Sequence, residues 1–316
     1  MKPIYEYLNI LSPERLRLTL FLFSIAALML LIEAKIAIAD TISVTDDLGR
    51  KITLEKPAQR LIALYGAYNE ILSEMGLGNR LIARTKADSY PEQMASKPSI
   101  GTHMRPNIEL ILGLKPDLII QNAGRKEAMV PVRQLIVQGL NVAVFNPDSF
   151  SGLFSVINRL GTLTGENEAG DRLIGQLKQR LEAVANCIAQ TEKRPSVLFE
   201  VRYPDLLAAG SDSIVNEVIR LAGGRNIFKQ KKKFVRLNIE EILRLNPDFY
   251  VIQKGPMNRD PGPPDRRPHF DKLDAVKHGR VLIVEEQVFS RPGPRSVSAV
   301  EDLSKRLHPG LFEKHE

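Results

Sequence analysis

"NIELILGLKPDLII", residues 107–120, returns later in the chain as "NIEEILRLNPDFYV", residues 238–251. The two stretches are 131 positions apart and agree at eight of their fourteen places. In each, a helical pattern ends at a Pro-Asp pair and an apolar run follows. Proline has no amide to donate to a helix, and the residue before it avoids the helical conformation. The sequence therefore predicts the same helix-to-strand joint twice, with a structural role for both Pro-Asp pairs.

A second internal echo supports this repetition. "NEILSEMGLGN" (69–79) and "NEVIRLAGGRN" (216–226) match at Asn, Glu, Gly and Asn with one constant offset of 147. Both echoes occur in the same order in the two halves of the chain. We therefore expect two lobes of similar construction, as a duplication would give.

Short apolar runs alternate with helical patterns around these echoes. Such runs, bounded by turn residues, indicate parallel strands that are buried on both faces. In the first half they are "RLIALY" (60–65), "DLIIQ" (117–121) and "NVAVFN" (141–146), and in the second "SVLFEV" (196–201), "DFYVIQ" (248–253) and "RVLIVE" (280–285). A β-hairpin is predicted ahead of them, over residues 41–54.

Between the halves, leucine, isoleucine and valine recur at helical spacing without an interior proline. The predicted fold class is α/β, with two Rossmann-like lobes whose sheets are rich in parallel strands, joined by a single long interdomain helix. The predicted divisions are a signal peptide at 1–39, a first lobe at 40–165, the connecting helix at 166–192 and a second lobe at 193–316.

The first forty residues have the composition of a secretory signal peptide. Charged residues precede about fifteen mostly apolar ones at 18–32, and Ala37-Ile38-Ala39 fits a cleavage site. An uncleaved membrane anchor is the alternative, but Glu33 and Lys35 interrupt the run before the roughly twenty residues that a spanning helix needs. The only cysteine is Cys187, so we expect neither a disulfide nor a lipid-anchor cysteine, and a periplasmic location.

Composition excludes some functions. The chain has 316 residues, of which 43% are hydrophobic and 26% charged, which is typical of a globular protein. Its formal net charge of +7 suits an anionic partner, but 6% aromatic residues and no stacking motif argue against nucleic acid. Residues 76–81, "GLGNRL", do not complete a dinucleotide-binding motif, and the five histidines lack paired ligand spacing.

The order of these motifs resembles a known family. The hairpin, the two "N-I-E" joints, the long helix, "GGRNI" (223–227) and "GRV" (279–281) followed by "RPGPR" (291–295) are together similar to the periplasmic binding proteins of ABC importers for ferric siderophores, haem and cobalamin. The resemblance covers nearly all of residues 41–309. It implies a monomer without a cofactor of its own, which holds an iron or cobalt chelate between its lobes and delivers it to a permease dimer with ATPase subunits.

Two glutamates match the family's docking positions. Glu70 in the first lobe and Glu217 in the second are paired by the internal echo. The resemblance implies one exposed glutamate on each lobe that contacts the permease. The alternative is that each glutamate only favours the first turn of its own helix through the helix dipole.

Candidate ligand residues follow the predicted strands, because ligands of α/β lobes bind beyond the carboxyl ends of the strands. Arginine offers forked hydrogen bonds to carboxylates, and tyrosine offers a flat face with a polar tip. Arg291 is the strongest single candidate through "RPGPR". The full set is Tyr65, Tyr68, Arg84, Tyr90, His103, Arg105, Arg125, Arg202, Tyr203, Lys254 and Arg291.

Metal contact is expected only through a chelate. If the ligand is haem, His103 or Tyr65 is the candidate axial ligand. The alternative for His103 is an ordinary polar or capping side chain. Residues 253–270 contain five prolines and three arginines, and this segment either reaches over the ligand cleft or forms a solvent-exposed insertion.

Two other functions remain open from the sequence. A tetrapyrrole metal chelatase with a related two-lobed fold is the enzymatic alternative, in which His103 would handle metal and protons. A ligand-binding module of a sensor is the other. Glu70 and Glu217 would separate a sensor module from a transport protein, because they should matter for docking to a permease and are not necessarily needed by a sensor.

Overall fold

The computed structural model describes residues 17, 21, 22, 24, 41–124 and 126–312. The predicted signal peptide lies almost entirely outside these residues and stays a prediction. Contacts divide the chain into residues 1–41 and 42–316, so both lobes belong to one compact unit. Among the described residues, no helix has both the length and the apolar character needed to cross a membrane.

The predicted hairpin is present at the start of the first lobe. Strands β1 (Ile42–Thr45) and β2 (Lys51–Leu54) pair in antiparallel register, with Ile42 opposite Leu54. Asp46 closes the turn, because its Oδ1 accepts hydrogen bonds from the amides of Leu48 and Arg50. Its Oδ2 accepts from the amide of Val144, which attaches the hairpin to the main sheet of this lobe.

The first lobe contains a four-stranded parallel sheet, in the order β4-β3-β7-β8. Its strands are β3 (Leu61–Ala63), β4 (Leu81–Ala83), β7 (Leu118–Asn122) and β8 (Val142–Phe145). The helices of this lobe are α2 (Gly66–Glu74), α3 (Ile108–Leu114), α4 (Met129–Val137) and α5 (Phe150–Thr164). The buried strands confirm the parallel sheet predicted from the apolar runs.

The second lobe has a mixed sheet, in the order β12-β10-β9-β13-β14, with β11 on β9. β9 (Ser196–Arg202), β13 (Phe249–Lys254), β14 (Val281–Glu285) and β11 (Arg225–Asn226) are parallel. β10 (Leu207–Ala209) and β12 (Phe234–Arg236) run antiparallel along one edge. Its helices include α7 (Ile214–Leu221), α8 (Ile239–Leu245), α9 (Asp274–Lys277), α10 (Glu286–Phe289), α11 (Arg295–Leu307) and α12 (Pro309–Phe312).

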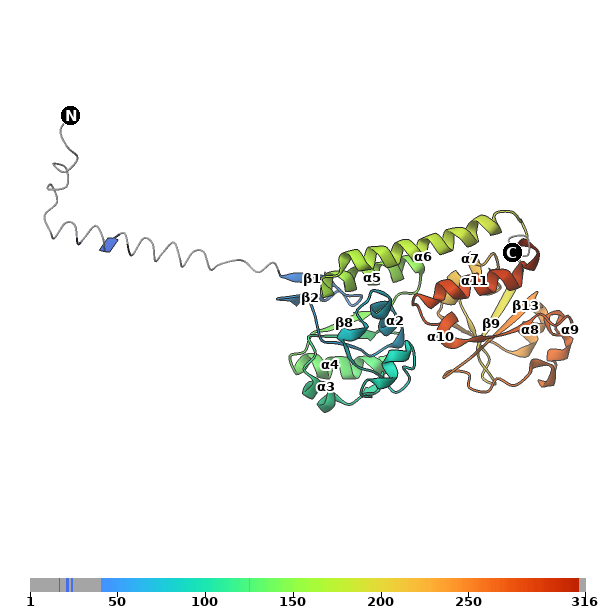
Figure 1. Ribbon diagram of the computed structural model, residues 1–316. Helices are drawn as coiled ribbons and strands as arrows, with labels where there is room; N and C mark the ends of the chain where they lie inside the picture. Colours follow the sequence, from blue (N-terminus) through green and yellow to red (C-terminus); the bar gives the residue numbers. More distant parts are fainter. Residues whose placement is uncertain (1–16, 18–20, 23, 25–40, 125, 313–316) are drawn as a thin grey trace, which may run out of the picture. The chain divides into compact units, whose positions relative to one another are not determined.

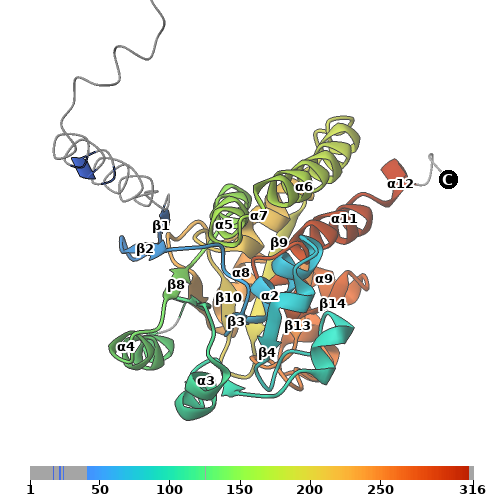
Figure 2. The ribbon, with the colours of Figure 1, turned by 60° about the vertical axis from the view of Figure 1, so that its left-hand side comes forward.

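The connecting helix is α6 (Asn167–Ile188), shorter than the predicted span at 22 residues, or about 33 Å. Gly165 ends α5 with a φ of 74° and redirects the chain into α6, which then packs back along α5. α6 also contacts α7, α11 and α12 (Figures 1 and 2). One apolar cluster contains buried residues from both halves of α6 and from the sheets of both lobes. The α6 residues are Leu173 and Leu177 in the first half and Val184 and Ile188 in the second.

The repeated joint uses the same contacts in both lobes. Asn107 caps α3 by accepting from the amide of Leu110 at 3.0 Å, and Asn238 caps α8 by accepting from the amide of Glu241 at 2.8 Å. Each helix ends at a left-handed residue directly before the proline, Lys115 in α3 and Asn246 in α8. The side chains that begin and end these helices therefore explain most of the repeated letters.

The aspartate of each Pro-Asp pair holds the neighbouring strand. Asp117 Oδ2 accepts from the amides of Gln59 and Arg60 at 2.8 and 2.9 Å, directly before β3. Asp248 Oδ2 accepts from the amide and hydroxyl of Ser196 at 2.7 and 2.6 Å, at the start of β9. The structural role predicted for the two pairs is confirmed, and it extends to the start of the strand beside each joint.

The second echo forms matching helix ends. Gly76 and Gly223 have φ values of 82° and 81°, the left-handed region that glycine adopts at low cost. After α2, the amide of Leu77 donates to Leu72 O, and after α7 the amide of Gly224 donates to Ile219 O. Both patterns are those of a glycine-terminated helix.

Removing either anchoring carboxylate should destabilise the fold. We expect Asp117→Ala and Asp248→Ala each to lower the free energy of unfolding by about 1–3 kcal/mol, because backbone donors at the start of a buried strand lose their acceptor. Asp260→Ala, at an exposed loop position, is the control. Urea denaturation of the three variants measures the effect, and equal stabilities would contradict the anchoring role.

The Asp248 anchor should also depend on pH. Burial acts to raise the pKa of Asp248, but the two Ser196 hydrogen bonds, together with the charges of Arg280 and Arg225, hold the pKa below its ordinary value of 3.8. A carboxyl group with a depressed folded-state pKa stabilises the fold above its unfolded pKa and loses this effect as the pH falls through the folded value. The stability difference between wild type and Asp248→Ala should thus be largest above about pH 4 and shrink in more acidic solution, as followed by urea denaturation at several pH values.

Candidate functional site

The candidate site lies where loops at the carboxyl ends of the parallel strands meet residues of the other lobe. Tyr65 follows β3, and the segment from Arg291 to Arg295 leads into α11 of the second lobe. The Arg291 guanidinium lies over the Tyr65 ring, 5.7 Å from its centroid. A β-carbon built on Gly293 would lie 3.2 Å from Cβ of Ala67, so the two lobes touch at this edge.

Tyr65, His103 and Arg291 form a group of three predicted ligand residues. The His103 ring stands edge-on to the Tyr65 ring, with centroids 6.2 Å apart and an interplanar angle of 73°. The carbonyl of His103 accepts a hydrogen bond from Nε2 of buried Gln121, which fixes the loop against β7. All three side chains are partly exposed. The structure thus brings together the strongest arginine candidate and the two candidate axial ligands.

A buried carboxylate stands beside this group. Asp88 Oδ2 accepts from the amide and hydroxyl of Thr85 and from the side chain of Asn69. A β-carbon on Gly66 would lie 2.7 Å from Asp88 Oδ1 and 2.9 Å from Arg291 Nη1, so a larger residue here would force at least one of these two side-chain ends to move. Burial raises the pKa of Asp88, while Thr85 and then Arg291 act to lower it.

Glu70 is occupied within the molecule. It is 2% exposed, and its two carboxylate oxygens accept from Nη2 and Nε of Arg295 at 2.5 and 2.9 Å. The Arg295 guanidinium also lies 4.3 Å from the centroid of the Tyr90 ring. Burial raises the pKa of Glu70, and the bound Arg295 opposes that rise. The prediction of an exposed glutamate is therefore wrong at this position, because an arginine 225 residues further along the chain covers it.

Glu217 is in a different environment. Its side chain is 24% exposed and forms an ion pair with Arg220, one turn later in α7, at 3.1 Å. Ser213 caps this helix through the amide of Asn216, so Glu217 also stands in the first turn, where the helix dipole favours it. Permease docking through Glu70 and Glu217 stays a prediction.

Tyr68 does not line the site. It is 0% exposed, its hydroxyl donates to the carbonyl of Phe145 at 2.9 Å, and it accepts from Nδ2 of Asn122 at 3.2 Å. Burial raises its pKa far above the ordinary value. The prediction that Tyr68 contacts ligand is wrong, because its hydroxyl stabilises the ends of β7 and β8 from inside the lobe.

The remaining predicted residues are spread over the strand ends of both lobes. Arg105 and Lys254 are exposed, and Tyr90 is 42% exposed. Arg84 and Arg202 are partly buried, and their Nε atoms lack a hydrogen-bond partner among the described residues. Arg202 also forms an ion pair with Asp205 at 3.3 Å. Arg125 lies outside the described residues.

Tyr203 belongs to a buried network that the sequence did not predict. Glu200, in the middle of β9, is 1% exposed and accepts from both terminal nitrogens of Arg267 at 2.5 and 3.1 Å. Tyr250 donates to the same carboxylate at 2.7 Å, and the Arg267 guanidinium lies 3.9 Å from the centroid of the Tyr203 ring. The signal was present as one glutamate inside the apolar run "SVLFEV" and one arginine in the proline-rich loop.

This network places part of the proline-rich segment. Arg267 is 5% exposed and also donates to the carbonyl of Pro261, while Phe270 is buried against Tyr250. The segment around these residues is therefore anchored into the second lobe, which neither sequence-based alternative described. Buried charges are stable only when they are paired and hydrogen-bonded, and here each partner has several bonds.

Breaking this pair should strongly destabilise the protein. We expect Arg267→Ala to lower the free energy of unfolding by about 3–5 kcal/mol, because Glu200 would remain buried without its partner. The neighbouring exposed Arg266→Ala serves as the matched control and should unfold like wild type. Chemical denaturation of both variants makes the comparison, and a mild effect of Arg267→Ala would show that the pair is not the anchor of the loop.

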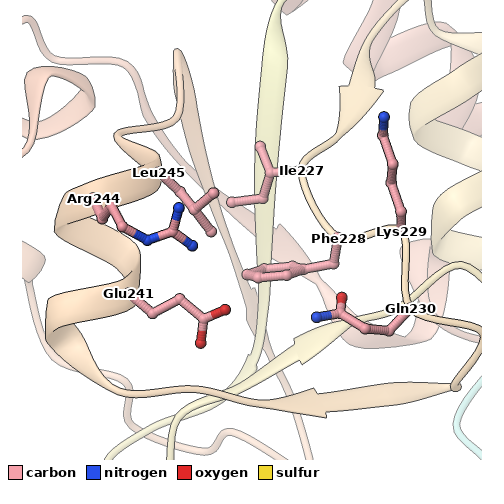
Figure 3. A pocket seen from close by; sticks show the side chains of 7 residues that line it. All are labelled: Ile227, Phe228, Lys229, Gln230, Glu241, Arg244 and Leu245. Carbon is pink, nitrogen blue, oxygen red and sulfur yellow. The ribbon is translucent and has the colours of Figure 1, made fainter.

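The described residues contain no cluster of three or more histidine, cysteine, aspartate or glutamate side chains that could hold a bare metal ion. Two surface pockets lie elsewhere on the second lobe, with volumes of about 420 and 530 Å³. In the smaller one, Glu241 and Arg244 extend from α8 toward Phe228 on the facing loop (Figure 3). Neither pocket includes Tyr65, His103 or Arg291, so we place the candidate site at the lobe contact by its chemistry.

Comparison with known proteins agrees with this arrangement. A family model described as periplasmic binding protein matches residues 61–288, and the chain belongs to this family. A substrate-binding lipoprotein of an ABC transporter from Bacillus subtilis, YvrC, is 28% identical over 86% of this chain and 87% of its own length. The chain is thus a substrate-binding protein of the kind that serves ABC transporters. Such binding proteins act outside the cytoplasm.

Solved structures give the same fold. The vitamin B12-binding protein BtuF of Vibrio cholerae is 26% identical, with a TM-score of 0.70, over 81% of this chain and 99% of that one. The haem-binding protein RhuT from Roseiflexus shares the fold at 23% identity and a TM-score of 0.71, over 80% of this chain and 99% of that one. These relatives are binding proteins, which favours this function over the chelatase alternative.

Proposed function

We propose that this protein captures a corrinoid of the vitamin B12 class between its two lobes and delivers it to an ABC importer. Support comes from relatives such as BtuF, whose name states that it binds vitamin B12. We further propose a periplasmic location after cleavage of residues 1–39, and delivery to a permease dimer with ATPase subunits. The only cysteine of this chain, Cys187, lies within α6, so the lipoprotein character of the Bacillus subtilis relative is not carried over.

The charge balance at the lobe contact is the observation that carries the choice of ligand. At this contact Arg295 binds Glu70, and Arg291 lies beside Asp88. In the second lobe Arg202 pairs with Asp205. An arginine that already faces a carboxylate offers little net charge to a polyanionic ligand. A corrinoid carries many amide groups around its ring and little net charge, so it suits such a site better than a polyanion does.

The polar groups available also suit an amide-rich ligand. Tyr65 supplies an aromatic face with a hydroxyl at its edge, which suits a flat macrocycle. The Nε atoms of Arg84 and Arg202 are buried donors that lack a protein acceptor among the described residues, and such donors favour a ligand that supplies carbonyl oxygens.

Haem is the second candidate. The neighbouring rings of Tyr65 and His103 favour it, because both side chains are known types of axial ligand to haem iron. In that case one of the two residues would coordinate the iron of the ligand, while Arg291 would contact a propionate. Catecholate and carboxylate siderophores, which form anionic ferric chelates, are the least favoured class by charge balance. A ferric hydroxamate is close to neutral, because three hydroxamates balance the charge of the ferric ion, and it is tested beside the other two ligands for that reason.

The first test is a titration of residues 40–316 with cyanocobalamin, haemin and a ferric hydroxamate, followed by calorimetry and thermal unfolding. A ligand that binds only the native state adds about 2.7 kcal/mol at a concentration one hundred times its dissociation constant. We expect saturable binding of cyanocobalamin and roughly tenfold weaker binding by Arg291→Ala.

Arg172→Ala, an exposed arginine on α6, is the control and should bind as wild type does. Tyr65→Phe and His103→Ala separate the two candidates, because loss of the haemin Soret shift in either variant would indicate axial coordination. Binding of none of the three ligands would contradict the proposed ligand class while leaving the family assignment intact.

A further inference from the structure

The second lobe has a basic pocket near the amino ends of its parallel strands, whereas the candidate site lies at their carboxyl ends. This pocket has a volume of about 530 Å³ and is lined by residues of α7, β11 and the following loop. β11 pairs with the first residues of β9, Arg225 opposite Ser196, so the pocket lies near the amino ends of the parallel strands. Tyr203 and Lys254, two of the predicted ligand residues, lie at the carboxyl ends.

Five cationic side chains surround this one cavity, and no carboxylate lines it. The cations are Arg194, Arg220, Arg225, Lys229 and Lys231, all of which are exposed at its rim. Several positive charges at one concave site raise the local concentration of anions. The basic run at residues 228–234, which the proposed transport function does not use, supplies two of the five.

Neighbouring carboxylates only partly balance these charges. Glu217 pairs with Arg220, and Asp248 is close enough to Arg225 for its pKa to be lowered by it. Asp212 is adjacent to the pocket residue Ser211 and accepts from its hydroxyl. Among the described residues, Arg194, Lys229 and Lys231 have no carboxylate within ion-pair distance.

Arg194 is positioned without being neutralised. Its Nη1 donates to the carbonyls of Thr191 and Lys193 at 2.7 and 2.8 Å. These two bonds hold the guanidinium against the loop between α6 and β9. The same charge acts with burial to lower the pKa of nearby His308. A guanidinium held by carbonyls keeps its full charge and presents its remaining N–H groups to a ligand.

The floor of the pocket is rigid and includes a further donor. Asn226 is 8% exposed, donates to the carbonyl of Ala209, and accepts from the amide of Phe228. Its Nδ2 also donates to Oδ1 of Asn216, a residue of the pocket wall whose side-chain amide nitrogen has no acceptor among the described residues. Phe228, 3% exposed, lies between this pocket and the one in Figure 3.

We propose that this pocket binds a phosphate group. A phosphate monoester or free phosphate carries close to two negative charges near neutral pH and offers three strong acceptor oxygens, so it can engage more cations at once than one carboxylate can. The cavity is larger than a single phosphate ion, so it has room for a phosphate that belongs to a larger molecule. The phosphodiester headgroup of an anionic phospholipid has the same kind of acceptor oxygens, with one negative charge and two non-bridging oxygens.

Two binding assays on the mature chain test the proposal and separate the sources. Calorimetric titration with inorganic phosphate and pyrophosphate measures the free anion. Cosedimentation with vesicles of phosphatidylglycerol and phosphatidylcholine, against vesicles of phosphatidylcholine alone, measures the headgroup. We expect saturable binding in at least one assay, weakened at least about tenfold in Lys229→Gln/Lys231→Gln and in Arg194→Gln/Arg225→Gln, and weakened by added salt.

Arg133→Gln/Arg172→Gln is the matched control, because it removes two exposed cations from other surfaces of the molecule and leaves the pocket intact. Thermal unfolding of all variants checks their folding, and the lysine pair keeps the test valid if the arginine pair is unstable. Binding in neither assay, or binding that the control weakens as much as the pocket variants do, would overturn the proposal. The ligand titration of the candidate site is unaffected by either result.

Discussion

The fold depends on one hydrophobic core that continues from the first lobe into the second. Leu61 and Phe145 of the first sheet belong to the same buried cluster as Val197 and Phe199 of the second. α6 links them, because its apolar stripe is buried in both halves of the helix, with Leu181 partly buried between them, and Arg180 forms hydrogen bonds to Glu301 of α11. A close-packed interior resists gradual deformation. We therefore expect the proposed site at the lobe contact to change little when a ligand binds.

A second, polar layer of contacts joins the lobes at the site itself. The buried Glu70–Arg295 pair costs desolvation free energy that its two hydrogen bonds offset, so it contributes specificity of lobe placement more clearly than stability. The same pair removes Glu70 from the surface in this structure. A partner that binds Glu70 would have to displace Arg295. Docking through Glu70 would therefore be coupled to the loss of this ion pair between the lobes.

Local sequence chemistry was sufficient to predict most of the fold. The asparagine caps, the left-handed helix ends and the Pro-Asp joints act within a few residues, so the echo at 107–120 and 238–251 could be interpreted directly. The helix-ending glycines Gly76 and Gly223 belong to the same category. The antiparallel edge formed by β10 and β12 was not predicted, because its pairing joins residues about thirty positions apart without a short turn signal.

The site was predicted less completely, because it depends on contacts between distant residues. Sequence placed Tyr65, His103 and Arg291 in loops, and the fold brings them together. It could not show that Tyr68 turns inward, since its partners Phe145 and Asn122 are more than fifty positions away. The Glu200–Arg267 pair was missed for the same reason, although a charged residue inside an apolar strand is a usable signal of a buried partner.

Hydrogen–deuterium exchange of the mature chain with and without cyanocobalamin tests the central claim most directly. We expect slower exchange in the strand-end loops of both lobes, at residues 64–68 and 101–105 in the first and 202–206 and 290–295 in the second. Amides of the basic pocket, at residues 224–231, should exchange at unchanged rates. Protection confined to one lobe, or to residues 224–231 alone, would contradict a ligand held between the lobes.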